Sequence, residues 1–417
     1  MTTDVSKSQI GSLAIFQGRP SFDDVLHVGR PNLGDRNRFF ERLNSIFDRN
    51  WLSNNGPIVQ EFEREVAKIS GTKHGVATCN GTVALEIAAR GLGMSGEVIV
   101  PSFTFVATAH ALQWQEITPI FCDVDPETHT LDPDKVKNLI TPRTTGIIGV
   151  HLWGIPCHLG PLQKIAKEHS LKLLYDGSHA FACRFGDQGF GSFGDATVCS
   201  FHATKVLNTF EGGAILTNDD DLARRLRLMK NFGFAGMDEV VCLGINGKMS
   251  EVNAAMGLAN LESLVDFIAV NRRHDKLYRN LLEGVPGLRI VPRGEEGESN
   301  HHYLVLEVDK EKAGLSRDEL LKVLHAENVR ARRYFYPGCH HMEPYKSLYP
   351  QAGDHLSVTE NLVNQVLCLP TGPALTDLAV RRIADIILLS LSHAGVVSNR
   401  LQERSGEQQV LKLPAWD

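Results

Sequence analysis

The chain has 417 residues, of which 42% are hydrophobic and 22% are charged, and its formal net charge is −6. This is the composition of a globular protein long enough to build two domains. Lysine and arginine are spread along the sequence, so neither nucleic acid nor an anionic membrane surface is expected as a partner.

Short apolar runs alternate with helical patterns from about residue 70 to residue 218, after an N-terminal arm (1–30) that we expect to be loosely structured. Strands are predicted at 97–101, 119–125, 144–154, 171–176, 195–201 and 213–218, with helices at 81–94, 106–115 and 159–170. Strands at this spacing, with helices between them, predict βαβ units and a mostly parallel sheet in an α/β fold.

A helix over 251–268 leads away from this sheet, and beyond it the pattern changes to α+β. Strands are predicted at 301–309 and 329–337. Helices are predicted at 316–326, opened by the capping box Ser316-x-x-Glu319, and at 376–391. We therefore expect a large domain over 31–270, a small C-terminal domain over 271–400 and a polar tail over 401–417.

Nothing in the sequence points to secretion or to a membrane span. The first residues, MTTDVSKSQIGSLAIF, lack a basic segment followed by a sustained apolar stretch. The most apolar long run, 383–397, is interrupted by Asp385 and His393 and is too short to cross a bilayer. The eight cysteines form no Cys-x-x-Cys pair, which predicts reduced thiols in a cytoplasmic protein.

Polar residues follow three of the predicted elements, at the sheet edge where open α/β sheets bind ligands. Asp176 ends one strand and His179 comes three residues later, while Lys205 follows the strand that contains Ser200. A single lysine in so uncharged a neighbourhood suits an amine nucleophile, because poor solvation lowers the pKa of the ammonium group. The pair Gly81-Thr82 begins a helix, where backbone N–H groups and the helix dipole favour a phosphate.

A strand-end carboxylate, a sheltered lysine and a phosphate cup are what pyridoxal 5′-phosphate (PLP) requires. The lysine forms a Schiff base, the carboxylate keeps the pyridine nitrogen protonated, and the helix terminus holds the phosphate. An aromatic ring should cover the cofactor, and Phe103 and Phe105 follow a strand directly.

Several segments together resemble the DegT/DnrJ/EryC1/StrS family of PLP-dependent nucleotide-sugar aminotransferases. They are NGTVALEIAARGLG, EVIVPSFTFVATAHAL, YDGSHAFA, SFHATK followed by EGG, and GINGKMSEVNAAMGL. The resemblance runs from about residue 25 to residue 395. It implies a fold-type-I PLP-dependent transferase, with the PLP-binding domain at 31–270.

Carried over by position, the resemblance implies roles for individual residues. Lys205 would be the Schiff-base lysine, Asp176 the pyridinium partner, and Phe105 the ring that stacks on the cofactor. Gly81, Thr82 and Ser200 would hold the phosphate. His179 departs from the glutamine found in many members; it can still contact the cofactor hydroxyl, with a charge that depends on pH. Asn246 resembles the asparagine that reaches the neighbouring subunit's phosphate, which implies a homodimer with shared active sites.

Retention of Lys205 favours transamination, since a dehydrating branch of the family carries histidine there. The expected donor is L-glutamate and the expected acceptor is the C4 ketone of a dTDP-4-keto-6-deoxyhexose. The segment 329–345 resembles C4 enzymes more than C3 enzymes, but a C3 aminotransferase remains an alternative. Tyr334, His340 and His151 are candidate substrate contacts. A PLP-binding regulator without turnover is a second alternative.

The histidine pairs at 301–302 and 340–341 raise the question of a metal. Neither pair has an i,i+4 partner or a nearby carboxylate at ligand spacing in the sequence. We therefore expect solvated or substrate-facing histidines and no metal site.

Overall fold

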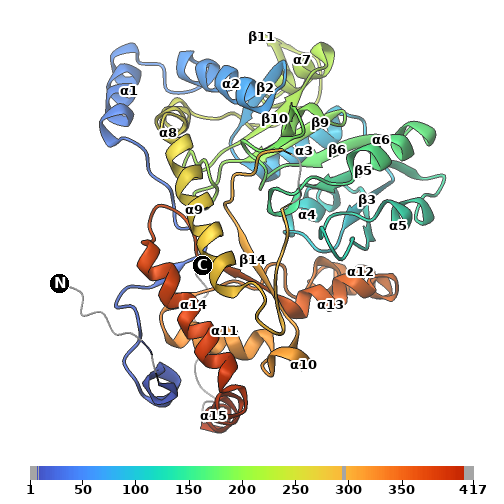
Figure 1. The fold of residues 1–417 in the computed structure, drawn as a ribbon. Helices are drawn as coiled ribbons and strands as arrows, with labels where there is room; N and C mark the ends of the chain where they lie inside the picture. Colours follow the sequence, from blue (N-terminus) through green and yellow to red (C-terminus); the bar gives the residue numbers. More distant parts are fainter. Residues whose placement is uncertain (1–6, 8, 294–296, 408–417) are drawn as a thin grey trace.

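The structure is a computed structural model that describes residues 7, 9–293 and 297–407. Its larger part is built around a central seven-stranded sheet, at the upper right of Figure 1, in the order β2-β10-β9-β6-β5-β3-β4. All neighbours are parallel except β10, which is antiparallel to both β2 and β9. The strands are β2 (His74–Thr78), β3 (Glu97–Pro101), β4 (Thr118–Cys122), β5 (Thr144–Val150), β6 (Lys172–Asp176), β9 (Ala196–Ser200) and β10 (Gly213–Thr217).

Helices cover both faces of this sheet, which explains why its strands are apolar at nearly every position. Alternate residues of one strand go to opposite faces: Val98 packs with α3, α4 and α7, whereas Ile99 packs with α5 and α6. The helices of this part are α1 (Arg36–Arg49), α2 (Pro57–Ser70), α3 (Gly81–Gly91), α4 (Ala107–Gln113), α5 (Pro133–Asn138), α6 (Leu159–Glu168), α7 (Asp220–Met229) and α8 (Glu251–Leu261).

The C-terminal part has a separate antiparallel sheet of three strands, in which β14 lies between β13 and β16. Helices α9, α11 and α14 pack on it around a buried apolar cluster. Its elements are β13 (Leu288–Ile290), β14 (Leu304–Val308), β16 (Val366–Leu369), α9 (Leu264–Leu282), α10 (Lys310–Ala313), α11 (Arg317–Ala326), α12 (Tyr345–Leu348), α13 (Ser357–Gln365), α14 (Asp377–Ser392) and α15 (Ala394–Glu407). The mostly parallel α/β sheet and the smaller α+β part confirm the predicted fold class.

Two predicted elements differ from the structure. The helix expected over 251–268 is two helices, because α8 ends at Leu261 and α9 begins at Leu264. The strand expected over 329–337 was wrong: only β15 (Val329–Arg330) is a strand, and it pairs with β1 (Leu26–His27). The capping box of Ser316 and Glu319 is present as predicted.

The described part of the N-terminal arm is packed rather than loose. Leu13 and Ile15 are fully buried in the cluster formed by the C-terminal part, so the arm adds to the core. Of the expected tail, 401–407 continue α15 and 408–417 lie outside the described residues. The continuous helix α9 crosses the predicted domain boundary, which stays a prediction. Within the described ranges, no helix combines the length and apolarity needed to cross a bilayer.

Candidate active site

A cavity of about 760 Å³ lies where the carboxyl ends of the central strands meet the C-terminal part. It brings together eight of the predicted site residues: Gly81, Thr82, Phe105, Asp176, His179, Ser200, Lys205 and Tyr334. These residues come from segments up to about 250 positions apart in the chain. Sheet topology unites all of them except Tyr334, which the C-terminal part contributes, because parallel neighbours place their carboxyl ends at one edge.

The carboxylate of Asp176 is held in one orientation at the end of β6. Its Oδ2 accepts a hydrogen bond from the Thr108 hydroxyl on α4 at 2.9 Å, and its Oδ1 accepts from the Ser178 N–H at 3.0 Å. The side chain lines the cavity although the residue is only 5% exposed. A fixed, sheltered carboxylate of this kind can pair with a protonated ring nitrogen.

Lys205 lies in the loop after β9, and its backbone N–H donates to the carbonyl of His202 at 2.9 Å. Burial of the amine lowers the pKa of Lys205 from its ordinary value to about 8, although the nearby Asp176 carboxylate works in the opposite direction. About a tenth of the amine is therefore uncharged at pH 7, far more than for an ordinary lysine, and the uncharged form is the one that acts as a nucleophile or proton acceptor.

This pKa predicts how Lys205 reacts with pH. In the cofactor-free protein, labelling of Lys205 by an amine-directed reagent should rise with pH, reach its midpoint at about pH 8 and level off roughly one pH unit higher. The uncharged form increases as pH rises through the pKa and then saturates. Exposed lysines ordinarily titrate near ~10.4, so their labelling should still be rising at pH 9. Peptide mapping by mass spectrometry measures the labelling of Lys205 and of the exposed lysines at each pH. If both depend on pH in the same way, the low pKa of Lys205 is contradicted.

The first turn of α3 lies where the sequence predicts the phosphate cup. Asn80 caps the helix, its side chain accepting from the Val83 N–H at 2.8 Å, and leaves the Gly81 and Thr82 N–H groups without partners in the helix. A Cβ added to Gly81 would lie 2.9 Å from Cβ of Ser200, so only glycine allows this close approach. The helix terminus and the Ser200 hydroxyl therefore fit an anionic group.

His179 is held as a neutral hydrogen-bond donor. Its Nδ1 accepts from the Trp153 backbone N–H at 3.3 Å, so the proton of the neutral ring lies on Nε2. Burial, with Lys205 and His302 nearby, holds the pKa of His179 well below its ordinary value. The pH-dependent charge expected from the sequence is thus not supported near neutrality. The ring stacks on Trp153 at a centroid distance of 5.6 Å and lies 4.3 Å from the Tyr303 ring.

The structure adds a support that sequence reasoning missed. The Asn300 amide donates to the carbonyl of His179 at 2.9 Å, and Nε2 of His302 lies 2.8 Å from the carbonyl of Thr204, one residue before Lys205. Burial lowers the pKa of His302 to about 4, so its ring is neutral and can donate this hydrogen bond. The C-terminal part thus fixes both the His179 and the Lys205 loops. Arginines 30 and 332 also line the cavity and supply positive charge.

Three predicted residues do not reach this cavity. His151 is fully buried and stacks on Tyr175 at 4.5 Å, and His340 is 3% exposed and bonded to Ser102, so neither position suits substrate contact. Asn246 is exposed on the surface and is absent from the cavity lining of its own chain. The first two were chosen by resemblance to the family, which does not show where an imidazole points.

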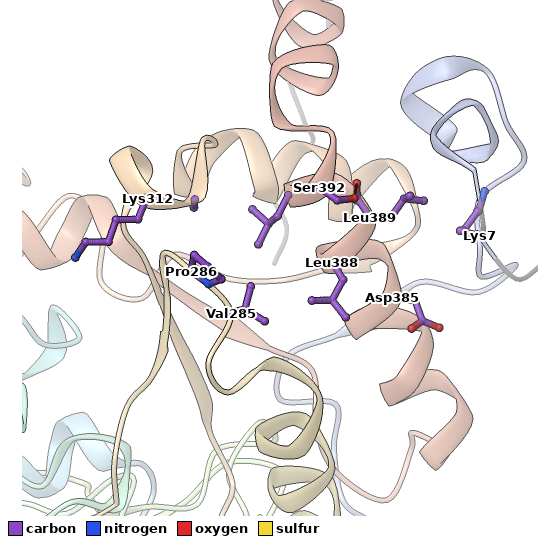
Figure 2. Close-up of a pocket in the computed structure, with 10 residues that line it drawn as sticks. Lys7, Val285, Pro286, Lys312, Asp385, Leu388, Leu389 and Ser392 are labelled. Carbon is purple, nitrogen blue, oxygen red and sulfur yellow. Dashed lines mark hydrogen bonds between the residues drawn. The ribbon is translucent and has the colours of Figure 1, made fainter.

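A second cavity, of about 590 Å³, lies in the C-terminal part (Figure 2). Val285, Pro286 and Leu388 surround it, and the carboxylate of Asp385 lies beside it. Lys7 also borders it, but its ammonium group is engaged by Glu327 and by the carbonyl of Arg19. None of the predicted site residues lines this cavity, so we assign the chemistry to the first one.

Comparisons with known proteins match most of this chain. The model of the DegT/DnrJ/EryC1/StrS aminotransferase family matches residues 34–388. A dTDP-4-amino-4,6-dideoxy-D-glucose transaminase from Escherichia coli is 36% identical over 369 residues, covering 88% of this chain and 99% of that protein. A UDP-N-acetyl-3-dehydro-alpha-D-glucosamine 3-aminotransferase from Acidithiobacillus ferrooxidans is 35% identical, and the match covers 82% of this chain and 89% of that protein.

Among solved structures, that of DesI in the presence of its TDP-sugar product superposes with a TM-score of 0.89. Its sequence is 46% identical, and the match covers 96% of this chain and all of that one. The predicted resemblance is confirmed over most of the length. The chain belongs to the DegT/DnrJ/EryC1/StrS aminotransferase family.

Proposed function

We propose that this enzyme transfers an amino group from L-glutamate to the C4 ketone of a dTDP-4-keto-6-deoxyhexose, giving a dTDP-4-amino-4,6-dideoxy sugar. PLP is the cofactor. The observation that carries the proposal is the meeting of Lys205, Asp176 and the α3 terminus in one cavity. The printed names of two relatives, a dTDP-4-amino-4,6-dideoxy-D-glucose transaminase and DesI with its TDP-sugar product, support the acceptor.

In this proposal, Lys205 transfers a proton and the other residues of the site hold the cofactor. When bound, PLP supplies an aldehyde that condenses with amines and a ring that withdraws electrons. Lys205, with a pKa of about 8, is the group that accepts and returns a proton at the reacting carbon. With PLP bound, Asp176 would keep the ring nitrogen protonated, and the Nε2–H of His179 would be the donor available to the ring oxygen. The α3 terminus and Ser200 would hold the phosphate.

We assign the two aromatic residues at the cavity wall to the cofactor ring and the sugar. Phe105 is 58% exposed although it follows a buried strand, because its ring faces the cavity, and we assign it to stack on the cofactor. Tyr334 stacks on Phe335 at 5.1 Å and presents its ring to the same space, and we assign it to the sugar. C3 amination is the second candidate function, because one relative is named as a 3-aminotransferase.

The position of amination can be read directly. Purified enzyme is incubated with L-glutamate in two parallel reactions. One contains dTDP-4-keto-6-deoxyglucose and the other a dTDP-3-keto-6-deoxyhexose, and each product is examined by NMR. We expect an amine at C4 and turnover with the 4-ketosugar alone. Turnover with the 3-ketosugar only would replace C4 amination by C3 amination. No turnover with either ketosugar would favour the alternative of a PLP-binding regulator without turnover.

We propose further that the enzyme is a homodimer with shared active sites. Two segments expose large apolar side chains, which is unusual for a monomer surface. The first segment, residues 232–245, contains β11 (Phe234–Gly236) and ends next to Asn246. The second segment lies in and just after α1, and α1 and β11 lie along the same upper side of Figure 1. The exposed residues are Phe232, Phe234, Met237, Val240, Val241, Leu243 and Ile245 in the first segment and Phe40, Phe47, Trp51 and Leu52 in and after α1.

A subunit-mixing experiment tests the shared site. Lys205→Ala and Asn246→Ala proteins should each be impaired as homodimers. A mixed dimer has one site with both lesions and one with neither, if Asn246 serves the partner's cup. After statistical exchange, about a quarter of wild-type activity should return, because half the dimers are mixed and half of their sites are intact.

Exchange is confirmed separately by co-purification of differently tagged subunits. If mixed dimers form and no activity returns, Asn246 acts within its own subunit. The comparison requires that Asn246→Ala alone be clearly impaired, which is measured first.

A further inference from the structure

Two adjacent histidines and a glutamate form a cluster outside the active-site cavity. His340 and His341 lie in the 3-10 turn Cys339–His341, and Glu360 lies in α13. Their Nε2 atoms are 2.8 Å and 2.7 Å from the same carboxylate oxygen, Oε1 of Glu360. The sequence showed no carboxylate at ligand spacing from this histidine pair, because Glu360 is 19 to 20 residues away.

The cluster is anchored to the ends of two neighbouring strands. Ser102, just after β3, contacts His340 at two points. Its hydroxyl oxygen lies 2.6 Å from Nδ1 of the ring and accepts a hydrogen bond from the backbone N–H of His340 at 3.1 Å. Asp123, just after β4, accepts hydrogen bonds from the N–H groups of Val358 and Thr359 at the start of α13. Since β3 and β4 are paired, the turn and the helix are held against each other.

The arrangement leaves one side open. His340 is buried, whereas the side chains of His341 and Glu360 are 43% and 39% exposed. Gly353 passes over the cluster, and a Cβ there would lie 3.4 Å from Oε1 of Glu360 and 3.7 Å from Nε2 of His340. Glycine therefore keeps free the space beside the three ligand atoms, which all lie within 4.8 Å of one another.

We propose that His340, His341 and Glu360 form a divalent metal site that binds Zn²⁺, with water in the fourth position. Two imidazoles and one carboxylate are a common zinc ligand set, and each Nε2 would move from 2.8 or 2.7 Å to roughly 3.3 Å from Oε1 in a tetrahedral site. On binding, Nε2 of each histidine gives its lone pair to the metal, and the ring proton lies on Nδ1. For His340 that proton is donated to Ser102, which fixes the ring as an outer partner does in zinc sites.

The ion cross-links the turn to α13. That turn follows Tyr334 and Phe335, which line the active-site cavity, by only a few residues. The site stabilises this wall and does not enter the transfer reaction. Zn²⁺ should therefore raise the midpoint of thermal unfolding, since binding to the folded state alone stabilises it by mass action.

Equilibrium dialysis of the chelator-treated full-length enzyme against Zn²⁺ tests the site. We expect one Zn²⁺ per chain from this site. We also expect at least a tenfold loss of affinity in His341→Ala and in Glu360→Gln, each of which removes one ligand at an exposed position. His355→Ala, which removes an exposed histidine nearby, is the matched control and should bind like wild type.

Circular dichroism verifies that each variant is folded, and if one ligand variant does not fold, the other decides. The chain also has eight cysteines that could take up Zn²⁺, so the comparison with the ligand variants is decisive. No saturable binding by wild type up to about 100 µM, or unchanged affinity in a folded ligand variant, overturns the proposal. The three side chains would then be a hydrogen-bonded group only.

Discussion

Lys205→Ala is expected to lower the rate of amino transfer by at least about a thousandfold, because it removes the group that moves the proton. The fold should survive, since Lys205 lines a cavity and is only half-buried. The variant should also lose the visible absorbance of a lysine-bound cofactor. The measurements are turnover of the 4-ketosugar with L-glutamate, the absorption spectrum and the thermal unfolding midpoint.

Two controls separate the chemistry of this amine from general damage. Lys164→Ala removes a lysine with a 75% exposed side chain and should leave the rate unchanged. A small external amine should restore part of the rate of Lys205→Ala, because a free amine can carry the same proton. Wild-type turnover in Lys205→Ala would remove Lys205 from the mechanism.

The central sheet could be predicted because its signals are local. Apolar runs of about five residues, separated by helical patterns, marked β3, β5, β6, β9 and β10, and the structure confirms each of them within a few residues. The capping box at Ser316 was equally readable, since its two hydrogen bonds join residues three positions apart. In both cases neighbouring residues determine the local structure.

The errors arose where distant contacts decide the local structure. The segment 329–337 has an aromatic and basic pattern that suggested a strand, but beyond β15 only Arg332 bridges Cys368. Aromatic packing takes over from the strand there: Tyr334 stacks on Phe335, and Phe335 on Trp153 at an interplanar angle of 10°. No pattern within these nine residues shows that the distant Trp153 is the partner of Phe335.

The distinction between local signals and distant contacts also holds for the residues of the candidate active site. Asp176, Lys205 and Gly81 were found because each follows or begins a regular element, and such ends meet at one edge of the sheet. His302 and Asn300 were missed, since they act by hydrogen bonds to backbone carbonyls about 100 residues away. His151 also follows a strand, but its ring turns to Tyr175 in the core. A position at a strand end therefore predicts a site only together with the side-chain direction.

The Glu251 of the KMSE segment shows how family resemblance can mark structural residues. Its carboxylate accepts hydrogen bonds from the backbone N–H groups of Ile58 and Val59, at 3.0 and 2.9 Å, and so caps α2 from a distant helix. Ser250 caps its own helix, α8. The segment carried strong weight in the resemblance, yet in this chain these two residues hold helices together rather than touch the cavity.

Asp176→Asn is expected to lower turnover by about 100- to 1,000-fold, equivalent to about 3–4 kcal/mol in the barrier. The amide is nearly the same size and can keep both hydrogen bonds: its oxygen accepts from the Ser178 N–H, and its NH₂ donates to the Thr108 hydroxyl, which can rotate to accept. The fold should therefore persist. What is lost is the negative charge that keeps the ring nitrogen protonated.

Thr108→Val is the matched control, because it removes one hydrogen bond to Asp176 and leaves the charge. Thr108 is fully buried and valine has its shape, so this variant should lose less than about tenfold in rate. Both variants are compared for turnover, bound cofactor by absorbance, and unfolding midpoint. If Asp176→Asn stays within about threefold of wild type with cofactor bound, the carboxylate is not the ring's charge partner. If both variants lose equally, the hydrogen bond rather than the charge is what the reaction needs.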